Sequence, residues 1–206
     1  MKFEHTEVAG LRSAIRGARS PLASWSKSDS YTSEDGSFVL GEADKALAQR
    51  LIKAGSEHRK FLRSIYVSVD ISAPALLWAE IDTYKVGTVR NSTSFMHKGV
   101  AHPFTLSDFE LSENHDMAYW DYVLEQLNYL RNKYLETKDY NYFLQIREIL
   151  PMSYIYRSTW TANYEVVRNI VIQRRHHRLP IWQDFIKWSK ELPYSEELIW
   201  CGVDDE

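Results

Sequence analysis

The chain contains only one cysteine among its 206 residues, Cys201. A single cysteine excludes a disulfide within the chain and is typical of a reducing compartment. The N-terminal stretch, MKFEHTEVAG, lacks the apolar run of a secretory signal peptide. No stretch approaches the roughly 18 apolar residues that a membrane helix needs. We therefore expect a cytoplasmic protein without a membrane partner.

Positive charge is also scarce, because 25 Lys and Arg residues face 28 Asp and Glu residues and give a net charge of −3. A chain of this charge has no overall attraction for nucleic acid, so we expect no nucleic-acid partner. The basic run RRHHR at 174–178 favours a helix C-terminus, where cations complement the helix dipole. His176 and His177 diverge on a helix, and His97, His102 and Asp108 lack a ligand spacing, so we predict no metal site.

Hydrophobic residues make up 44% of the chain and aromatic residues 14%, with seven Trp and thirteen Tyr. This composition indicates a globular protein with a substantial core. The aromatic residues fit an aromatic-rich core, and the alternative is a pocket for a planar ligand. The length and the absence of a linker predict a single domain over residues 1–206.

Hydrophobic periodicity predicts one clear strand and several amphipathic helices. The strand covers residues 64–72, SIYVSVDIS, and leads to Pro74, where a helix should begin. A shorter strand is expected at 3–8, and loops are expected at 20–37 and 84–99. Helices are expected at 10–18, at 41–55 with Ala43, Leu47, Leu51 and Ala54 on its buried face, around 120–134, and at 139–150, 163–175 and 180–192. We expect an α+β fold in which a small mixed sheet is packed with long helices.

Two residues at the ends of one predicted helix share a face. Asn163 and Arg174 are separated by three helical turns plus about 20°, with an axial distance of about 16 Å, so an extended ligand fits alongside them. The spacing of Arg147 from Phe143 and Leu150 places it on the apolar face of its own helix, where a guanidinium needs an anion. Each Arg suits a phosphate or a carboxylate ligand, and the alternative for each is an ion pair within the fold.

The stretch IREILPMSYIYRSTWTANYEVVRNIVIQRR, residues 146–175, resembles the C-terminal half of the flavin-dependent thymidylate synthases. That family has an Arg before a Leu-Pro, then a Trp-Thr-x-Asn, and an Arg at the end of the following helix. The matching residues here are Arg147 before Leu150-Pro151, Trp160-Thr161-Ala162-Asn163, and Arg174. Upstream, His58 and the turn at Ala73-Pro74 match a Gly-His and an Ala-Pro of the family. The resemblance covers roughly residues 41–190.

The resemblance implies that Arg147 and Arg174 bind the substrate dUMP, that Arg174 is the catalytic arginine, and that Asn163 and His58 contact FAD. It implies a homotetramer whose active sites are shared between subunits. It also implies a reaction in which reduced FAD supplies a hydride, with methylenetetrahydrofolate and NADPH as co-substrates. No protein nucleophile is required, whereas a classical thymidylate synthase attacks the pyrimidine with a cysteine.

The basic signature of the family, Arg-His-Arg-x-x-Ser-x-Asn-Glu-x-Ser-x-Arg-Tyr, falls on residues 83–96 of this chain. Its first triplet reads Thr83-Tyr84-Lys85 here, and its final Arg-Tyr reads Phe95-Met96. Much of the positive charge of the signature is therefore absent.

The residues that remain in this segment are expected to take over part of its work. Lys85 and Arg90 are candidate substrate-binding residues, and Thr88 and Asn91 are candidate cofactor-binding residues. Glu165 stands where the family has an Arg, and its carboxylate should repel a nearby diphosphate.

Three hypotheses follow from these residues. The first is a divergent flavin-dependent thymidylate synthase that binds FAD more weakly than is usual for the family. The second is a protein of the same fold that binds a nucleotide without methyl transfer. The third is a structural relative that retains only the fold.

Overall fold

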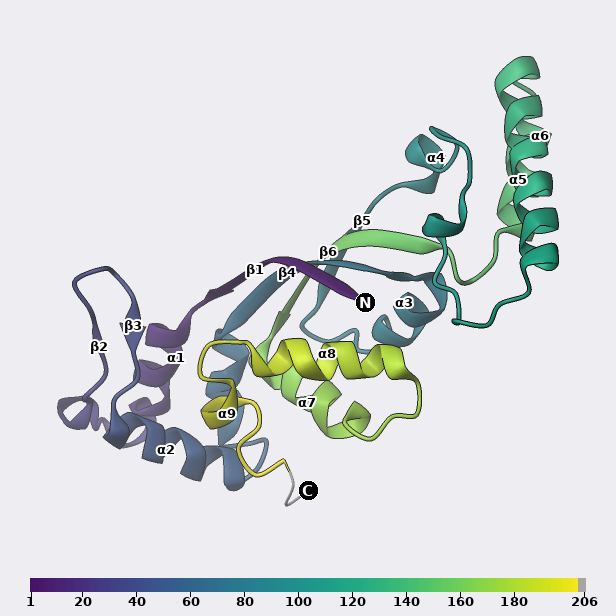
Figure 1. Cartoon of the computed structure of the whole chain (residues 1–206). Helices are drawn as coiled ribbons and strands as arrows, with labels where there is room; N and C mark the ends of the chain where they lie inside the picture. The colour runs from purple at the N-terminus through teal and green to yellow at the C-terminus, as the bar shows by residue number, and fades with distance from the viewer. Residues whose placement is uncertain (204–206) are drawn as a thin grey trace. The chain divides into compact units, whose positions relative to one another are not determined.

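The computed structural model describes residues 1–203, which form two compact units (Figure 1). The first unit contains Met1–Ile71, Tyr84–Arg90 and the chain from Thr159 onward. The second unit contains Ser72–Thr83 and Asn91–Ser158. Because the chain passes between the units four times, each unit is built from discontinuous segments, and the single domain over 1–206 stays a prediction.

The strands are β1 (Lys2–Ala9), β2 (Tyr31–Thr32), β3 (Phe38–Val39), β4 (Tyr66–Pro74), β5 (Val89–Ser92) and β6 (Ile155–Asn163). The α-helices are α1 (Leu11–Ala18), α2 (Glu42–Lys53), α3 (Ala75–Ile81), α4 (Phe95–Lys98), α5 (Met117–Thr137), α6 (Tyr140–Ile149), α7 (Tyr164–Arg174), α8 (Pro180–Lys190) and α9 (Ser195–Leu198). The short 3₁₀ helices are η1 (Ser20–Leu22), η2 (Trp25–Lys27), η3 (Arg59–Ser64) and η4 (Leu106–Asp108).

Four strands form one sheet in the order β1-β4-β6-β5, and β2 pairs with β3 as a separate antiparallel hairpin. The predicted α+β class, with a small sheet and long helices, is confirmed. No helix within residues 1–203 has both the length and the apolar character needed to cross a membrane.

The pairing of β4 with β6 sets the centre of the sheet. Ser68 bonds to Thr161 across the two strands (3.2 Å), and Asp70 accepts a hydrogen bond from Thr159 (2.6 Å). The residue numbers rise along β4 while those of their partners fall along β6, so the two strands are antiparallel. The backbone N–H of Tyr164 donates to the carbonyl of Ile65, which continues the same register to the start of α7.

The buried faces of these strands follow alternating side chains. Val67, Val69 and Ile71 are all at most 1% exposed and form the inner face of β4, and Ile65 just before it is also buried. The predicted strand at 64–72 is thus confirmed, although it covers Tyr66–Pro74. Strand β6 was not predicted from the sequence. Its inner face is formed by Ser158, Trp160 and Ala162, and a serine and an alanine give a weak hydrophobic alternation.

The helix α7 begins where the sequence predicts, because Asn163 caps it. The side-chain oxygen of Asn163 accepts a hydrogen bond from the N–H of Val166 (3.0 Å), and this satisfies one of the free donors of the first turn. The helix buries Val167, Ile170 and Val171. It also buries Arg168, whose guanidinium donates to the carbonyls of Ile199 and Cys201, both at 2.7 Å.

Arg168 therefore ties the C-terminal segment to α7. Cys201 is itself buried, and Val203 is 1% exposed. Val203 thus belongs to the core, and Asp204, Asp205 and Glu206 lie outside the described residues.

The predicted buried face of α2 is wrong by one position. The helix buries Asp44, Ala48 and Ile52, whereas Ala43 and Ala54 are exposed. The reason is that Asp44 is held by polar partners inside the fold: its carboxylate accepts hydrogen bonds from Arg19 (2.5 Å), the Ser28 hydroxyl (2.6 Å) and the Ser30 N–H (3.0 Å). The C-terminus of α2 ends as expected at Gly55, whose φ of 108° is in the left-handed region.

The segment at 20–37, expected to be a loop, contains η1, η2 and the first strand of the β2–β3 hairpin. The segment at 84–99, also expected to be a loop, contains β5 and α4. Both predictions were too coarse, because Gly, Ser and Asn are frequent in these segments and short elements give almost no periodicity.

The second unit contains a helical hairpin in which α5 and α6 lie side by side (Figure 1). Lys138 turns the chain between them with a φ of 58°. Both helices were predicted. Their inner faces join one hydrophobic cluster, whose buried members are Val100, Phe104, Phe109, Leu127, Leu130, Phe143 and Ile146.

Asp44 provides a test of the polar network at the start of α2. Burial alone would raise its pKa, but the hydrogen bonds from Ser28, Ser30 and Arg19 outweigh burial and hold the pKa at about 2, below the ordinary 3.8. The resulting stabilisation is present above about pH 4 and is lost as the pH falls toward the folded-state value.

Replacing Asp44 by Asn should therefore lower the free energy of unfolding by about 2 kcal/mol at neutral pH. Urea unfolding at several pH values should show a smaller loss of stability between about pH 4 and pH 2 in D44N than in the unaltered protein. E34Q serves as the control, because Glu34 is an exposed carboxylate in the segment at 20–37, which also contains Ser28 and Ser30. Equal acid sensitivity of D44N and the unaltered protein would contradict this account.

Candidate functional site

Arg174 is held in place at the C-terminal end of α7. Its Nε donates to the hydroxyl of Tyr84 (3.1 Å), and that hydroxyl donates to Oε1 of Gln173 (3.0 Å). The guanidinium carbon also lies 4.8 Å from the ring centre of Trp182, within the range of a cation–π contact. The charge of Arg174 is thus fixed in direction, which a binding site for an anion requires.

Asn163 contacts the same segment at the other end of α7. Gly87 packs so closely against it that a Cβ atom at position 87 would lie 2.8 Å from Nδ2 of Asn163. Gly87 has a φ of 80°, which also favours glycine. Residues 84–87 therefore contact both Arg174 and Asn163, the two residues that the sequence placed on one face.

The remaining candidates of this segment differ in exposure. The hydroxyl of Thr88 donates to the backbone carbonyl of Tyr84 (2.8 Å), so it stabilises the turn. Lys85 is exposed and Arg90 is half-buried on β5. Asn91 is exposed and belongs to the second unit, unlike the other three.

His58 borders a large groove in the first unit. The groove has a volume of about 760 Å³ and lies between α1, α2 and η3. Its apolar lining includes Leu47, Leu51 and Phe61, and its charged lining consists of Arg50, Glu57, Lys60 and Arg63 beside His58. The two leucines belong to the face of α2 that the sequence predicted to be fully buried. A groove of this size and lining fits a large, partly apolar anion.

Glu165 forms an ion pair within the first unit. Its Oε1 accepts a hydrogen bond from Nε of Arg59 (3.1 Å), and each side chain is 17% exposed. The sequence predicted an unbalanced negative charge here, but Arg59 balances it. This partner could not be predicted from the sequence, because 106 positions separate the two residues.

Arg147 lies in the second unit, on α6. The prediction that it shares the apolar face of its helix is wrong: Phe143 and Ile146 are buried, whereas Arg147 is exposed. Arg147 directly follows Ile146 and lies at the edge of the buried face, so its long side chain extends into solvent. Its convergence with Arg174 on one phosphate stays a prediction.

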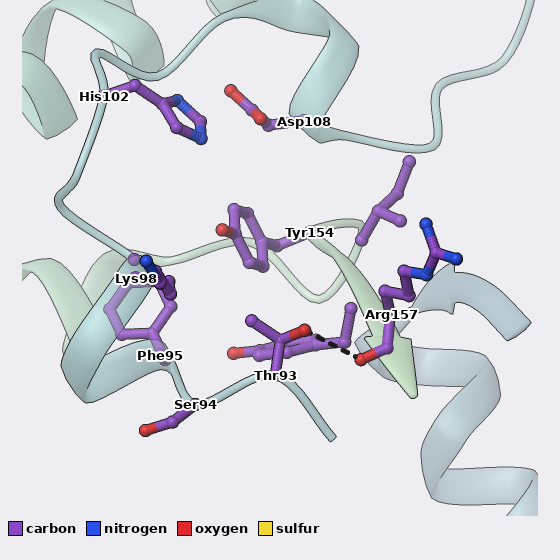
Figure 2. A pocket seen from close by; sticks show the side chains of 11 residues that line it. Thr93, Ser94, Phe95, Lys98, His102, Asp108, Tyr154 and Arg157 are labelled. Atoms are coloured by element: carbon purple, nitrogen blue, oxygen red, sulfur yellow. Dashed lines mark hydrogen bonds between the residues drawn. The ribbon is translucent and has the colours of Figure 1, made fainter. Parts of the chain in front are cut away.

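The second unit contains a pocket of about 200 Å³ (Figure 2). The side chains of His102 and Asp108 lie on the same side of Tyr154, and Phe95 and Lys98 come from α4. The hydroxyl of Thr93 donates to the carbonyl of Arg157 (3.1 Å). The other lining residues are Ser94, Gly99, Ile155, Tyr156 and the Arg157 side chain.

This pocket offers more cations than carboxylates. Two cationic side chains, Lys98 and Arg157, line it beside one carboxylate, that of Asp108, among the described residues. Burial raises the pKa of the Tyr154 phenol to about 12, with further contributions from Asp108 and Tyr156. The phenol therefore stays protonated and can donate a hydrogen bond to a small anion.

The sequence did not predict this pocket. His102 and Asp108 were considered as metal ligands, and no group of three or more suitable ligands occurs within residues 1–203. The pocket joins residues near 93–108 to residues near 154–157, and only strand and helix packing brings such distant segments together.

The fold has close structural relatives. No family model matches the chain, and no curated protein does. A crystal structure of the flavin-dependent thymidylate synthase ThyX from Helicobacter pylori, complexed with FAD and dUMP, superposes with a TM-score of 0.72 at 18% identity, covering 97% of this chain and 98% of that one. A second crystal structure of that enzyme with FAD and dUMP gives the same TM-score and identity. The chain has the ThyX fold, so the family resemblance seen in the sequence is confirmed for the fold.

Removing Arg59 should destabilise the protein, because it leaves the carboxylate of Glu165 without its ion-pair partner. Oε2 of Glu165 is already buried without a hydrogen-bond partner within the described residues. R59A should lower the free energy of unfolding by about 2 kcal/mol. R59A/E165Q should recover part of this loss, and K60A, at the exposed neighbouring position, should have little effect. An unchanged stability of R59A in urea unfolding would contradict the proposed balance of charge.

Proposed function

We propose that this protein is a divergent relative of ThyX that binds dUMP and methylates it to dTMP with methylenetetrahydrofolate and reduced FAD. The observation that carries the proposal is the fixed guanidinium of Arg174, held by Tyr84 and Trp182 at the end of a helix that Asn163 caps. These residues stand where the resemblance places the substrate arginine and the flavin-contacting Asn. The ThyX structures that share the fold contain FAD and dUMP.

We assign the phosphate of dUMP to Arg174, and, on the resemblance alone, also to Arg147 of the second unit. Two guanidiniums match the charge and the geometry of a phosphate dianion. Arg174 also acts as the catalytic arginine by holding positive charge beside the pyrimidine as negative charge develops there. Lys85 and Arg90 add positive charge to the substrate site. Cys201 is buried and has no role as a nucleophile.

The end of the family signature lies in the pocket of Figure 2. Phe95 occupies the position of the signature Arg, and Lys98 and Arg157 line the same pocket. We propose that these two cations replace the charge that Phe95 lacks. Arg157 was not among the candidates drawn from the sequence, because it precedes the Trp-Thr-x-Asn motif in an unrecognised strand.

The residues of the first unit fit FAD. The groove beside His58 is large enough for a dinucleotide, and its apolar floor and basic rim suit a flavin ring and a diphosphate. The ion pair with Arg59 reduces the repulsion expected from Glu165. His58, Thr88 and Asn163 would hold the cofactor, which supplies a hydride when reduced, and NADPH would be the reductant. A role for Asn91, which belongs to the second unit, rests on the resemblance alone.

The loss of the basic triplet still weakens the expected affinity for FAD. Tyr84 stands inside that triplet, and its hydroxyl is engaged by Gln173 and Arg174. This observation favours the alternative function, a nucleotide-binding protein of the same fold without methyl transfer. A homotetramer in the cytoplasm is proposed for either function, on the basis of the resemblance and the single cysteine.

Substitution of the two arginines tests the substrate site. R147A and R174A should each weaken dUMP binding by roughly 1.5 to 3 kcal/mol, because each loses a charged hydrogen bond to the phosphate. R178A, at an exposed Arg beyond the end of α7, is the matched control and should bind dUMP normally. Calorimetric titration of folded variants is the measurement. If R147A and R174A bind dUMP as R178A does, the assigned phosphate site is wrong.

Separate titrations distinguish the enzyme from the nucleotide-binding protein. We expect dUMP to bind without FAD, and FAD to bind weakly, as followed by flavin absorbance near about 450 nm. Release of tritium from labelled dUMP, with methylenetetrahydrofolate and NADPH present, measures turnover. Tight FAD binding with turnover would contradict the weakened flavin site. If neither ligand binds, only the third hypothesis remains, which is a structural relative that retains the fold.

A further inference from the structure

A second cavity in the first unit lies beside α1, η2 and β3 and has a volume of about 250 Å³. It is distinct from the groove beside His58, since the two share no lining residue. Its lining consists of Arg12, Ile15, Arg16, Arg19, Trp25, Ser28, Ser30 and Phe38. The proposed function uses none of these residues.

Three arginines of this cavity follow one side of α1. Arg12, Arg16 and Arg19 are spaced four and three residues apart, so their side chains lie on one helical face. Like charges at this spacing destabilise a helix, and α1 contains no acidic residue to offset them. The arrangement therefore costs stability unless an anion binds there.

The carboxylate that contacts Arg19 is already engaged. Asp44 accepts hydrogen bonds from Arg19, Ser28 and Ser30, and it is 1% exposed. Arg19 is 5% exposed and is held rigidly by this contact. Arg12 and Arg16 are exposed, and no ion pair is formed by either among the contacts of residues 1–203. The cavity consequently carries excess positive charge.

The segment that covers the cavity is anchored and not free to collapse. The carboxylate of Asp29 accepts hydrogen bonds from the N–H groups of Ala43 and Asp44, and the hydroxyl of Ser30 accepts one from the N–H of Gly41. On the other side, the hydroxyl of Tyr194 donates to the carbonyl of Phe38 (2.7 Å). These contacts hold Phe38 and the backbone at residues 29–30 in a preformed arrangement.

Trp25 presents a large apolar surface from this anchored segment. Its side chain is 51% exposed although it lines the cavity. An exposed indole on a rigid segment, beside several guanidiniums, is suited to stack on a planar ring. The volume is below the roughly 300 Å³ of typical cofactor pockets, so a single ring fits and a dinucleotide does not.

We propose that this cavity binds a small ligand made of one aromatic or heteroaromatic ring with a phosphate or carboxylate group. Arg12 and Arg16 bind the anionic group, Arg19 fixes the floor, and Trp25 and Phe38 contact the ring. The segment at 20–37 thus has a function of its own, as the wall of a second ligand site. This inference does not depend on dUMP or FAD binding elsewhere.

Titration with phenyl phosphate tests the proposal, with benzoate as the carboxylate probe. The full-length protein should bind at least one of the two saturably in calorimetry, and R12Q/R16Q should weaken that binding by roughly tenfold or more. W25A should weaken it by roughly threefold to tenfold, because stacking is lost. R178Q, which alters an exposed Arg beyond the end of α7, should bind normally. Circular dichroism confirms that each variant is folded.

Two further probes separate the ring from the charge. Inorganic phosphate and benzyl alcohol should each bind more weakly than phenyl phosphate, because each offers only one of the two contacts. Binding that is equal in R12Q/R16Q and in the unaltered protein would overturn the proposal, and so would the absence of binding by both ring-containing anions. Equal binding of phosphate and phenyl phosphate, unaffected by W25A, would reduce the cavity to a general anion surface and also overturn it.

Discussion

The antiparallel register between β4 and β6 is the constraint on which the first unit depends. It places the N–H of Tyr164 against the carbonyl of Ile65, so that α7 begins directly beside the end of η3. From this single register it follows that Glu165 meets Arg59 and that Asn163 caps α7 next to Gly87. A shift of one residue would turn Trp160 and Ala162 out of the core, so the core fixes the register.

Three arginines of the first unit are committed to internal partners. Arg168 holds the C-terminal carbonyls, Arg59 balances Glu165, and Arg19 binds Asp44. Arg174 is directed by a tyrosine hydroxyl and an indole ring, which fix the orientation of its guanidinium.

Helix α1 separates two kinds of ligand environment within one unit. Ala14, Gly17 and Ala18 line the wide groove beside His58, where small side chains leave room for a large ligand. The opposite side carries Arg12 and Arg16 and closes a small cavity with Trp25. The absence of acidic residues in α1 keeps both environments positive. The two environments therefore differ in volume, about 760 Å³ against about 250 Å³, and in lining.

The sequence by itself determined the elements whose signals are local: the alternation of β4, the cap of α7 at Asn163, the left-handed Gly55 and the periodicity of α5, α6 and α8. Its motif around Arg147, Asn163 and Arg174 also indicated the fold. Strand β6 was not predicted, because Ser158 and Ala162 give only a weak hydrophobic alternation. The buried face of α2 was predicted wrongly, because an Asp such as Asp44 is expected at the surface and not in the core. Only the tertiary structure decided that Arg59 balances Glu165, that Arg147 is exposed, and which distant segments enclose the three cavities. Those features depend on contacts between residues far apart in the chain, and neither spacing nor composition encodes which charge will meet which.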